Sequence, residues 1–457
     1  MERKNEFLGT EPIKRLLLRL AAPTVAAQLI NMLYNVVDRI YIGHMPGEGD
    51  LALTGVGVCL PIILIVSAFA ALVGSGGGPR ASIAMGRKAY AEAENIMGSC
   101  LAFLVMISLV LTSALLLWGE KLLMVFGASE NTIGYAWAYM SVYAVGTVFV
   151  QLTLGMNPFI TAQGFTRMGM MTVLIGAGLN ILLDPLFIFG FGMGVRGAAL
   201  ATILSQGVSC VWVLWFLRGR KSVLLLKKEN IRLNFRVVGP CVALGVAPFI
   251  MQASESVIAV CFNASLLRYG GDVAVGAMTI LTSVMQFAMM PLQGLASGAQ
   301  PIISYNYGAG SEARVRETFR LLLRVSLIYS FALWALVQLF PGVFAGIFTS
   351  DEVLRAFAAD ALRIYCGVIC LFGIQVACQM TFVSLGMAGS SVLVAVMRKF
   401  VLLLPLIYIM PQLMADKTRA VYTAEPVADF LAVSFTAVLF FFRFRKTMKE
   451  IQIPETQ

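Results

Sequence analysis

Three carboxylic acids lie well inside long apolar stretches of this chain, where charged residues are scarce. They are Asp38, Asp184 and Glu255. An ionisable side chain within hydrocarbon costs several kcal/mol, and such residues usually mark ion pathways, proton relays or substrate sites. Each acid is therefore a candidate for cation binding or proton transfer.

Asp38 follows a set of polar residues that a helix would place together. Asn31, Asn35 and Asp38 are spaced by four and then three residues, so they share one helix face, with Tyr34 beside it. A polar stripe on a membrane-spanning helix indicates a water-filled cavity, and Tyr34 and Asn35 are candidate substrate contacts. The alternatives are an ion pair of Asp38 with Arg39, or a position of Asp38 near the external interface.

Asp184 lies one helical turn after Asn180 and directly before Pro185. Proline has no backbone donor, so it frees the carbonyl near Ile181 and opens the helix locally. A carboxylate, an amide oxygen and a free carbonyl are ligands that suit a hard cation. Thr202, in the following apolar stretch, could add a hydroxyl. The alternative is a hydrogen bond between helices.

A substrate site is expected around the third acid. Glu255 could neutralise a cationic substrate or form a second proton site, or it could pair with Arg398 or Lys399. Methionine repacks around ligands of different shape. Candidate cavity residues are therefore Met285 and Met289, with Gln286 adding polarity.

The elements that must position these residues are membrane helices. Of 457 residues, 59% are hydrophobic and 13% charged. The apolar blocks of about 20–27 residues are long enough to cross the hydrocarbon core as helices. The sequence predicts an all-α integral membrane protein with twelve spans, at 14–41, 51–78, 93–118, 133–157, 165–190, 195–218, 238–266, 273–300, 318–342, 357–384, 390–412 and 424–444.

The positive charge is distributed unevenly over the loops between these spans. Lys and Arg gather near both chain ends, including Arg3 and Lys4, and in the loops around 80–88, 218–236 and 314–324. Cytoplasmic loops hold such an excess, so both termini are expected in the cytoplasm of a bacterial cell, with the chain in its inner membrane. This topology accounts for the net charge of +10 without a nucleic-acid partner.

An internal repeat divides the chain into two halves. A shift of about 222 residues aligns Pro79 with Pro301 and Gly86 with Gly308. We expect an amino-terminal lobe at 1–217, a cytoplasmic linker at 218–237, a carboxy-terminal lobe at 238–445 and a tail at 446–457, with substrate held between the lobes.

The repeat also locates the predicted cation coupling. Asp38 aligns with Asn263 and Asp184 with Leu406, so the acids of the first half are not repeated in the second. Polar groups that served only the shared architecture would be expected in both halves. We therefore expect cation coupling in the amino-terminal lobe.

Other chemistry lacks support in the sequence. The glycines of 74–78 are followed by Pro79 and not by the Lys-Ser/Thr pair of a nucleotide-binding loop. His44 is the only histidine, and the eight cysteines show no zinc-site spacing. We expect a transporter and not an enzyme, with no cofactor and with an ion gradient as its energy source.

The residues from Asn180 to Thr202 resemble the signature of the fifth and sixth helices of MATE (multidrug and toxin extrusion) transporters. Gln163-Gly164 and Gln300-Pro301 fit the same family. The likeness covers the whole chain and is greatest for the MepA-like branch. It implies two pseudo-symmetric six-helix bundles in a V, and monomeric export of lipophilic or cationic drugs driven by Na⁺ or H⁺.

The resemblance also implies a cation site built from Asp38, Asn180, Asp184 and Thr202, which would be the Na⁺ ligands in a sodium-coupled protein. Some relatives combine an acid matching Glu255 with an acid of the tenth helix. This chain offers only Ile374 and Gln375 there, so it departs from that pattern.

A flippase for lipid-linked oligosaccharides, from the same superfamily, is the main alternative function. Its cavity should be cationic to hold pyrophosphate, and only Arg39, Arg398 and Lys399 are candidates for such a role. A membrane-embedded enzyme or a passive channel is a further alternative.

Overall fold

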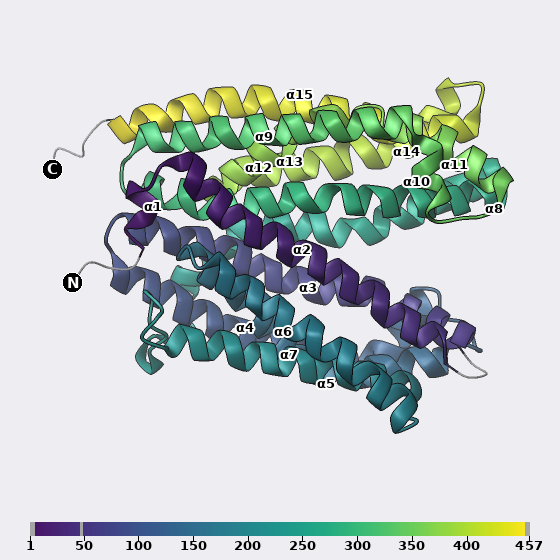
Figure 1. Ribbon diagram of the computed structural model, residues 1–457, viewed down its shortest axis with the longest axis horizontal. Helices are drawn as coiled ribbons and strands as arrows, with labels where there is room; N and C mark the ends of the chain where they lie inside the picture. The colour runs from purple at the N-terminus through teal and green to yellow at the C-terminus, as the bar shows by residue number, and fades with distance from the viewer. Residues whose placement is uncertain (1–4, 46–48, 453–457) are drawn as a thin grey trace.

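The structure is a computed structural model that describes residues 5–45 and 49–452 (Figure 1). Arg3 and Lys4, counted in the predicted charge asymmetry, and residues 453–457 of the predicted tail lie outside the described residues. Within the described ranges the regular structure is entirely helical.

The first half of the chain forms six long helices after a short one. Their bounds are α1 (Phe7–Thr10), α2 (Ile13–Gly43), α3 (Gly49–Gly86), α4 (Tyr90–Val125), α5 (Ile133–Ala162), α6 (Thr166–Pro185) with the π-helical turn η1 (Leu186–Gly190), and α7 (Gly194–Arg218). At 1.5 Å per residue, each of the helices α2 to α7, with η1 extending α6, can cross a hydrocarbon core of about 30 Å.

The second half follows a connecting segment that contains η2 (Lys228–Asn230). Its elements are α8 (Phe235–Gly308), α9 (Glu312–Leu339), α10 (Pro341–Gly346), α11 (Glu352–Tyr365), η3 (Ile369–Leu371), α12 (Phe372–Ser384), α13 (Ala388–Val396), the π-helical η4 (Met397–Leu403), α14 (Leu404–Leu413) and α15 (Lys417–Gln452).

Helix α8 contains two membrane spans and not one. Its 74 residues are interrupted at Gly271, which has φ 66° and ψ −162°, a conformation that is open to glycine. Among the described residues, ten helices can cross a membrane, and the pair α11 and η3–α12, bent by 46°, forms an eleventh crossing. Since α8 is one of those ten and crosses twice, the chain crosses twelve times, as predicted.

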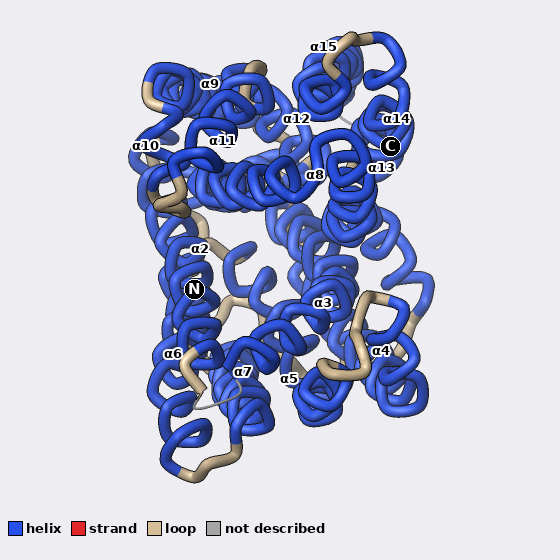
Figure 2. The backbone as a smooth tube through the Cα atoms, turned by 90° about the vertical axis from the view of Figure 1, so that its right-hand side faces the viewer, coloured by secondary structure: helices blue, strands red, loops and turns tan. Residues whose placement is uncertain are grey.

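The helices form two bundles, here called the amino lobe (α2–α7) and the carboxy lobe (α8–α15). Seen end-on, α3 to α7 gather on one side and α9 to α15 on the other, with α8 at their boundary (Figure 2). Helix α1 and the carboxy end of α15 lie at the same end of the molecule (Figure 1), as an even number of crossings requires.

The predicted repeat is visible where the lobes cross. A Cβ on Gly86 would lie 2.0 Å from the carbonyl oxygen of Tyr305, and a Cβ on Gly308 would lie 2.0 Å from that of Ile83. Gly86 and Gly308 are the residues that the repeat aligns. The two backbones therefore touch through a pair of equivalent glycines, because any side chain there would separate them.

Both ends of the predicted carboxy lobe differ slightly from the helix bounds. Helix α8 starts at Phe235, within the predicted linker 218–237, because the side chain of Asn234 accepts a hydrogen bond from the Arg236 amide and caps the helix. Helix α15 runs on to Gln452, so the first part of the predicted tail is helical.

Candidate functional site

The four residues predicted to hold a cation come together in the amino lobe. The Asn180 amide Nδ2 on α6 donates to Asp184 Oδ1 at 3.2 Å and to Thr202 Oγ1 on α7 at 3.4 Å. The carboxyl of Asp38, on α2, lies within hydrogen-bonding reach of the carboxyl of Asp184. Three helices thus contribute to one cluster, here called the amino-lobe cluster. Asp38 and Asp184 within it are called the amino-lobe acid pair.

Local sequence explains how α6 presents its part of the cluster. Asn180 and Asp184 are one turn apart and therefore share a face. After Pro185 the α-helix gives way to the π-helical turn η1, which widens the backbone just beyond the acid. The predicted opening at the Ile181 carbonyl stays a prediction, because the widened turn lies after Pro185 and α6 is α-helical up to it. π-turns of this kind are often found at functional sites.

Several oxygens of this cluster have no donor. Asp38 Oδ1, Asn180 Oδ1 and Asp184 Oδ2 are buried and make no hydrogen bond. Buried polar atoms are nearly always paired, because an unpaired one loses its water without replacement. Orphaned acceptors from three contacting residues fit a bound cation.

The chemistry of these oxygen atoms determines which kind of cation would fit. Two carboxylates, an amide oxygen and the Thr202 hydroxyl are hard oxygen ligands, which suit Na⁺ or a shared proton and not a soft transition metal. The Thr202 hydroxyl donates to the Ala198 carbonyl at 3.0 Å, and its oxygen accepts from the Asn180 amide at 3.4 Å. Arg39, the alternative partner of Asp38, is exposed and forms no ion pair with it in the described part of the chain.

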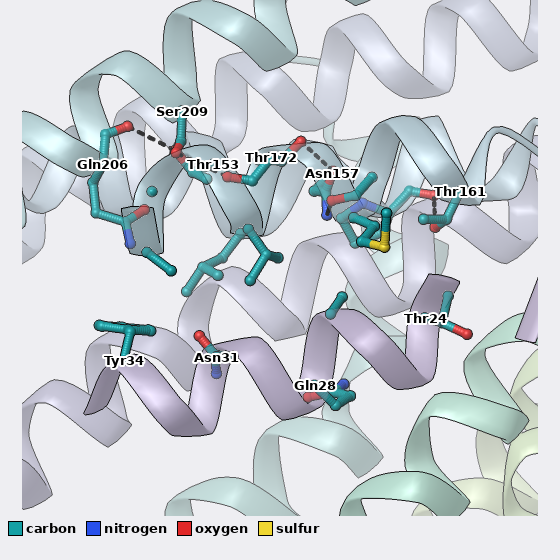
Figure 3. Close-up of a pocket in the computed structure, with 18 of the residues that line it drawn as sticks. Thr24, Gln28, Asn31, Tyr34, Thr153, Asn157, Thr161, Thr172, Gln206 and Ser209 are labelled. Atoms are coloured by element: carbon teal, nitrogen blue, oxygen red, sulfur yellow. Dashed lines mark hydrogen bonds between the residues drawn. The ribbon is translucent and has the colours of Figure 1, made fainter. Parts of the chain in front are cut away.

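A cavity of about 280 Å³ leads to this cluster through the amino lobe (Figure 3). Asn180 and Thr202 belong both to the cavity wall and to the cluster. Among the described residues, no charged side chain lines the wall. Its polar members are Thr24, Gln28, Asn31, Tyr34, Thr153, Asn157, Thr161, Thr166, Thr172, Asn180, Thr202, Ser205, Gln206, Ser209 and Ser297.

The polar stripe predicted on α2 faces this cavity. Gln28, Asn31 and Tyr34 lie across it from side chains of α5, α6 and α7 (Figure 3). Tyr34 is close enough to Asp38 and Asp184 to interact with both, and it hydrogen-bonds with Asn35. Asn35 itself is exposed and donates to the Asn31 carbonyl at 2.7 Å.

The structure does not bring Glu255 to the amino-lobe cluster. Glu255 Oε1 on α8 accepts from Lys399 Nζ at 2.7 Å, with the lysine side chain 4% exposed and the glutamate 57%. An ion pair with Arg398 or Lys399 was the alternative to a role of Glu255 in binding substrate or a proton. The predicted role of Glu255 in substrate binding stays a prediction.

The predicted methionine contacts also lie elsewhere. Met285 and Met289 pack against the apolar core of the carboxy lobe, and the sulfur of Met285 lies 3.8 Å from that of Cys366. Gln286 is exposed on α8. Their part in substrate binding is likewise untested, but they do not line the cavity of the amino lobe.

Two acids of α15 were missed by the sequence interpretation. Arg398 donates from Nε to Asp429 at 2.9 Å and lies 3.6 Å from Glu425, and all three side chains are buried. Glu425 and Asp429 are four residues apart within the predicted span 424–444. Two acids at this spacing share one helix face, and this pattern in the sequence could have identified them.

Comparison with known proteins gives one family over both lobes. The MatE family model matches residues 23–186 and 248–409, one segment in each lobe. Multidrug export protein MepA of Staphylococcus haemolyticus is 23% identical, covering 99% of this chain and 98% of its own. The protein of the same name from Staphylococcus aureus is 22% identical, with 98% of both chains covered.

Solved structures share the whole architecture. The MATE multidrug transporter DinF-BH, solved in complex with a ligand, is 33% identical with a TM-score of 0.90, covering 98% of this chain and 99% of its own. A MATE structure in a bent conformation is 22% identical with a TM-score of 0.92 and the same coverage.

Proposed function

Because the chain belongs to the MatE family of membrane transporters, we propose that it exports lipophilic or cationic drugs in exchange for Na⁺ or H⁺. Relatives named multidrug export proteins match it along its full length, and a 33% identical multidrug transporter has been solved with a ligand bound. The observation that carries the exchange mechanism is the amino-lobe acid pair. Asp38 and Asp184 lie together, with orphaned oxygens and no cationic side chain in the cavity that leads to them.

The acid pair can couple because two adjacent carboxyls favour the uptake of positive charge. Two ionised carboxylates at hydrogen-bonding distance repel, so the site takes up a proton or a metal cation in the absence of substrate. The ligands come from α2, α6 and α7. A bound cation therefore draws α2 toward α6 and α7, and its release lets α2 move away.

The contacts between the lobes support alternating access. Gly76 and Gly245 meet the opposite backbone at Cys241 and Leu72, in the second half of α3 and the first turns of α8. Since α3 is the second crossing and α8 begins the seventh, the end of α3 and the start of α8 face the side of the chain termini. With the termini in the cytoplasm, as the loop charges predict, this state is closed to the cytoplasm. Bending of α2 near Pro23 would accompany the exchange of cation for substrate.

The flippase alternative has less support. A pyrophosphate group needs cationic side chains, and the amino-lobe cavity offers none. In the carboxy lobe, Arg398 and Lys399 are already paired with carboxylates. We also propose that the protein acts as a monomer, which the molar mass of the detergent-solubilised protein would test.

Ethidium transport in membrane vesicles tests the proposed function. The wild-type protein should move ethidium against its gradient when a Na⁺ gradient or a pH gradient is imposed, and each gradient is applied separately to identify the coupling ion. The double variant Asp38→Asn/Asp184→Asn should abolish this response. Asp360→Asn, at an exposed acid of α11, is the matched control.

Gradient-driven ethidium transport that persists at wild-type rate in the double variant would refute the role of the acid pair. A wild-type protein that moves no organic cation under either gradient would refute export itself.

A further inference from the structure

Two cysteines from different lobes meet inside the molecule, although they are far apart in the chain. Cys100 lies on α4 of the amino lobe, and Cys241 lies in the first turns of α8 in the carboxy lobe. Their thiols are close enough to interact through a hydrogen bond. The same two helices also meet at Phe103 and Phe235, whose rings pack edge to face with centroids 6.3 Å apart. The two thiols therefore lie where the lobes touch.

Adjacent glycines of α3 allow both cysteines to approach the same turn. A Cβ on Gly76 would lie 1.9 Å from the carbonyl oxygen of Cys241. A Cβ on Gly77 would lie 3.0 Å from the sulfur of Cys100. These contacts place the two cysteines next to each other independently of the interaction between their thiols. A pair of sulfurs already in contact needs only a small further approach to reach the bond length of a disulfide, about 2.05 Å.

Other buried cysteines of this chain lack such a partner. Cys210 on α7 and Cys378 on α12 are 4% and 2% exposed, but neither interacts with another thiol in the described structure. Burial alone therefore does not pair the cysteines of this protein. The contact between Cys100 and Cys241 is a specific feature of the lobe boundary.

The guanidinium of Arg80, on α3, lies beside the pair and interacts with both thiols. Arg80 forms no ion pair in the described part of the chain, and its buried Nε has no hydrogen-bond partner. Reactive cysteines occur in such electropositive surroundings, because the thiolate is the form that attacks an oxidant. Arg80 is only half-buried, so the thiols border a residue that water reaches.

The burial of the pair determines which oxidant can reach it. Cys100 and Cys241 are both 0% exposed, so a bulky reagent is excluded, whereas hydrogen peroxide is uncharged and nearly as small as water. One thiolate attacks a peroxide oxygen, the O–O bond breaks, and the hydroxide that leaves takes up the proton which the thiol lost. The product is a sulfenic acid. The second thiol displaces its oxygen as water and forms the S–S bond. Two thiols and one peroxide thus give one disulfide and two waters.

We propose that Cys100 and Cys241 form a peroxide-dependent disulfide site that locks the two lobes together at the end of the molecule that holds the chain termini. The thiols touch in the present state, in which the lobes are closed at that end. When the lobes part there, α4 and α8 must separate, and a covalent bond between them prevents this. Cytosolic disulfides are usually transient and redox-sensing, so reduction would release the lock. The lock rests on the proposed export by alternating access, whereas the disulfide site does not.

Counting free thiols tests the site in the purified full-length protein. Reduced protein is treated with hydrogen peroxide, unfolded in detergent and labelled with a maleimide that adds mass to each free thiol. Of its eight cysteines, the wild type should lose two labels, and dithiothreitol should restore both. Cys241→Ser has no second thiol at the site, so it should lose at most one. Cys210→Ser, the matched control at an unpaired buried thiol, should lose two like the wild type.

A cross-linked peptide identifies the bond and requires no variant to fold. Proteolysis of the oxidised wild type without reductant should release a peptide in which Cys100 is joined to Cys241, as read by mass spectrometry. A full set of free thiols after peroxide treatment would overturn the proposal. Oxidation of one thiol alone, or a disulfide between other cysteines, would overturn it as well.

Ethidium transport in membrane vesicles tests the lock. In the oxidised wild type, the gradient-driven rate should fall in proportion to the fraction of protein that carries the disulfide, and dithiothreitol should restore it. Cys100→Ser should keep its own untreated rate after the same peroxide treatment. Cys210→Ser should lose its rate as the wild type does. A Cys100–Cys241 disulfide that leaves transport unchanged would refute the lock.

These outcomes separate the inference from the proposed function. Wild-type vesicles that transport ethidium, from a protein that forms no Cys100–Cys241 disulfide, would refute only this inference. A wild-type protein that moves no ethidium before oxidation would refute export and the lock with it, while the cross-linked peptide would still decide whether the disulfide site exists.

Discussion

The two lobes share a backbone plan but treat buried acids in opposite ways. In the amino lobe, Asp38 and Asp184 lie together and form no ion pair in the described structure; Arg39 interacts with Asp38 only at longer range, and oxygens of both acids make no hydrogen bond. In the carboxy lobe, Glu255 and Asp429 are each paired with a basic side chain of η4. A site that must take up a free cation leaves its acids unpaired, whereas fixed charge needs a permanent counter-charge.

Two glycines at equivalent positions show which contact between the lobes both halves of the chain retained. Gly86 and Gly308 make equivalent close contacts across the lobe boundary. The lobes thus kept this contact, and they diverged in the charge held inside each bundle.

Arg398→Met should destabilise the protein more than any other single change considered. It leaves Asp429 and Glu425 buried beside each other without their counter-charge, which typically costs about 3–5 kcal/mol. Unfolding of the detergent-solubilised protein would measure this loss. Asp38→Asn in the amino lobe removes a charge that forms no ion pair in the described structure, so it should cause no comparable loss. Equal destabilisation by the two variants would contradict the contrast.

Asp184→Asn should remove the stabilisation that the coupling ion confers. An ion that binds the folded state at one hundred times its Kd adds about 2.7 kcal/mol, which raises the Tm of the wild type. Thermal scans with added Na⁺, and separately with added acid, would identify the ion. Glu255→Gln, in the other lobe, should keep the rise in Tm. Loss of that rise in Glu255→Gln but not in Asp184→Asn would place the coupling-ion site in the carboxy lobe and contradict the prediction.

Gly86→Ala and Gly308→Ala should have similar effects, since each new Cβ would meet opposing backbone at 2.0 Å. Overpacking of this kind costs about 1–3 kcal/mol and here would separate the lobes where the ends of α3 and α8 touch. Gly239→Ala is the control, because no atom lies within 4 Å of its new Cβ. Unfolding curves for the three variants would check the expectation. A large difference between Gly86→Ala and Gly308→Ala would count against equivalent contacts.

Asp360→Asn should change stability least. Asp360 pairs with Arg419 at 2.6 Å, but both side chains are more than half exposed, at 53% and 58%. Exposed pairs contribute about 0–1 kcal/mol. Unfolding with and without added salt would measure the difference. A loss comparable with that of Arg398→Met would show that burial is not what separates these ion pairs.

Much of the amino-lobe site could be predicted from sequence, because its signals are local. Asn180 and Asp184 are one turn apart, Pro185 follows directly, and the stripe on α2 has helical spacing. Their meeting with Thr202 was expected from the resemblance to MATE transporters, and the structure confirms that these residues contact one another.

The buried ion pairs of the carboxy lobe could be predicted only in part. The pairing of Glu255 with Lys399 was one of two alternatives, and Glu425 and Asp429 were not considered. Glu255 and Lys399 are separated by more than a hundred residues, so no helical spacing relates them. Which acid meets which base depends on how α8, η4 and α15 pack.

From the amino-acid sequence alone it follows that the chain spans the membrane, that it crosses twelve times in two related halves, and that acids lie within those spans. These properties follow from the length and polarity of continuous segments and from residues a turn apart. Which acids form ion pairs is seen only in the folded protein, because pairing depends on distances between helices remote in the chain. The unpaired acids of the amino lobe and the paired acids of the carboxy lobe are therefore distinguished only once the bundles are assembled.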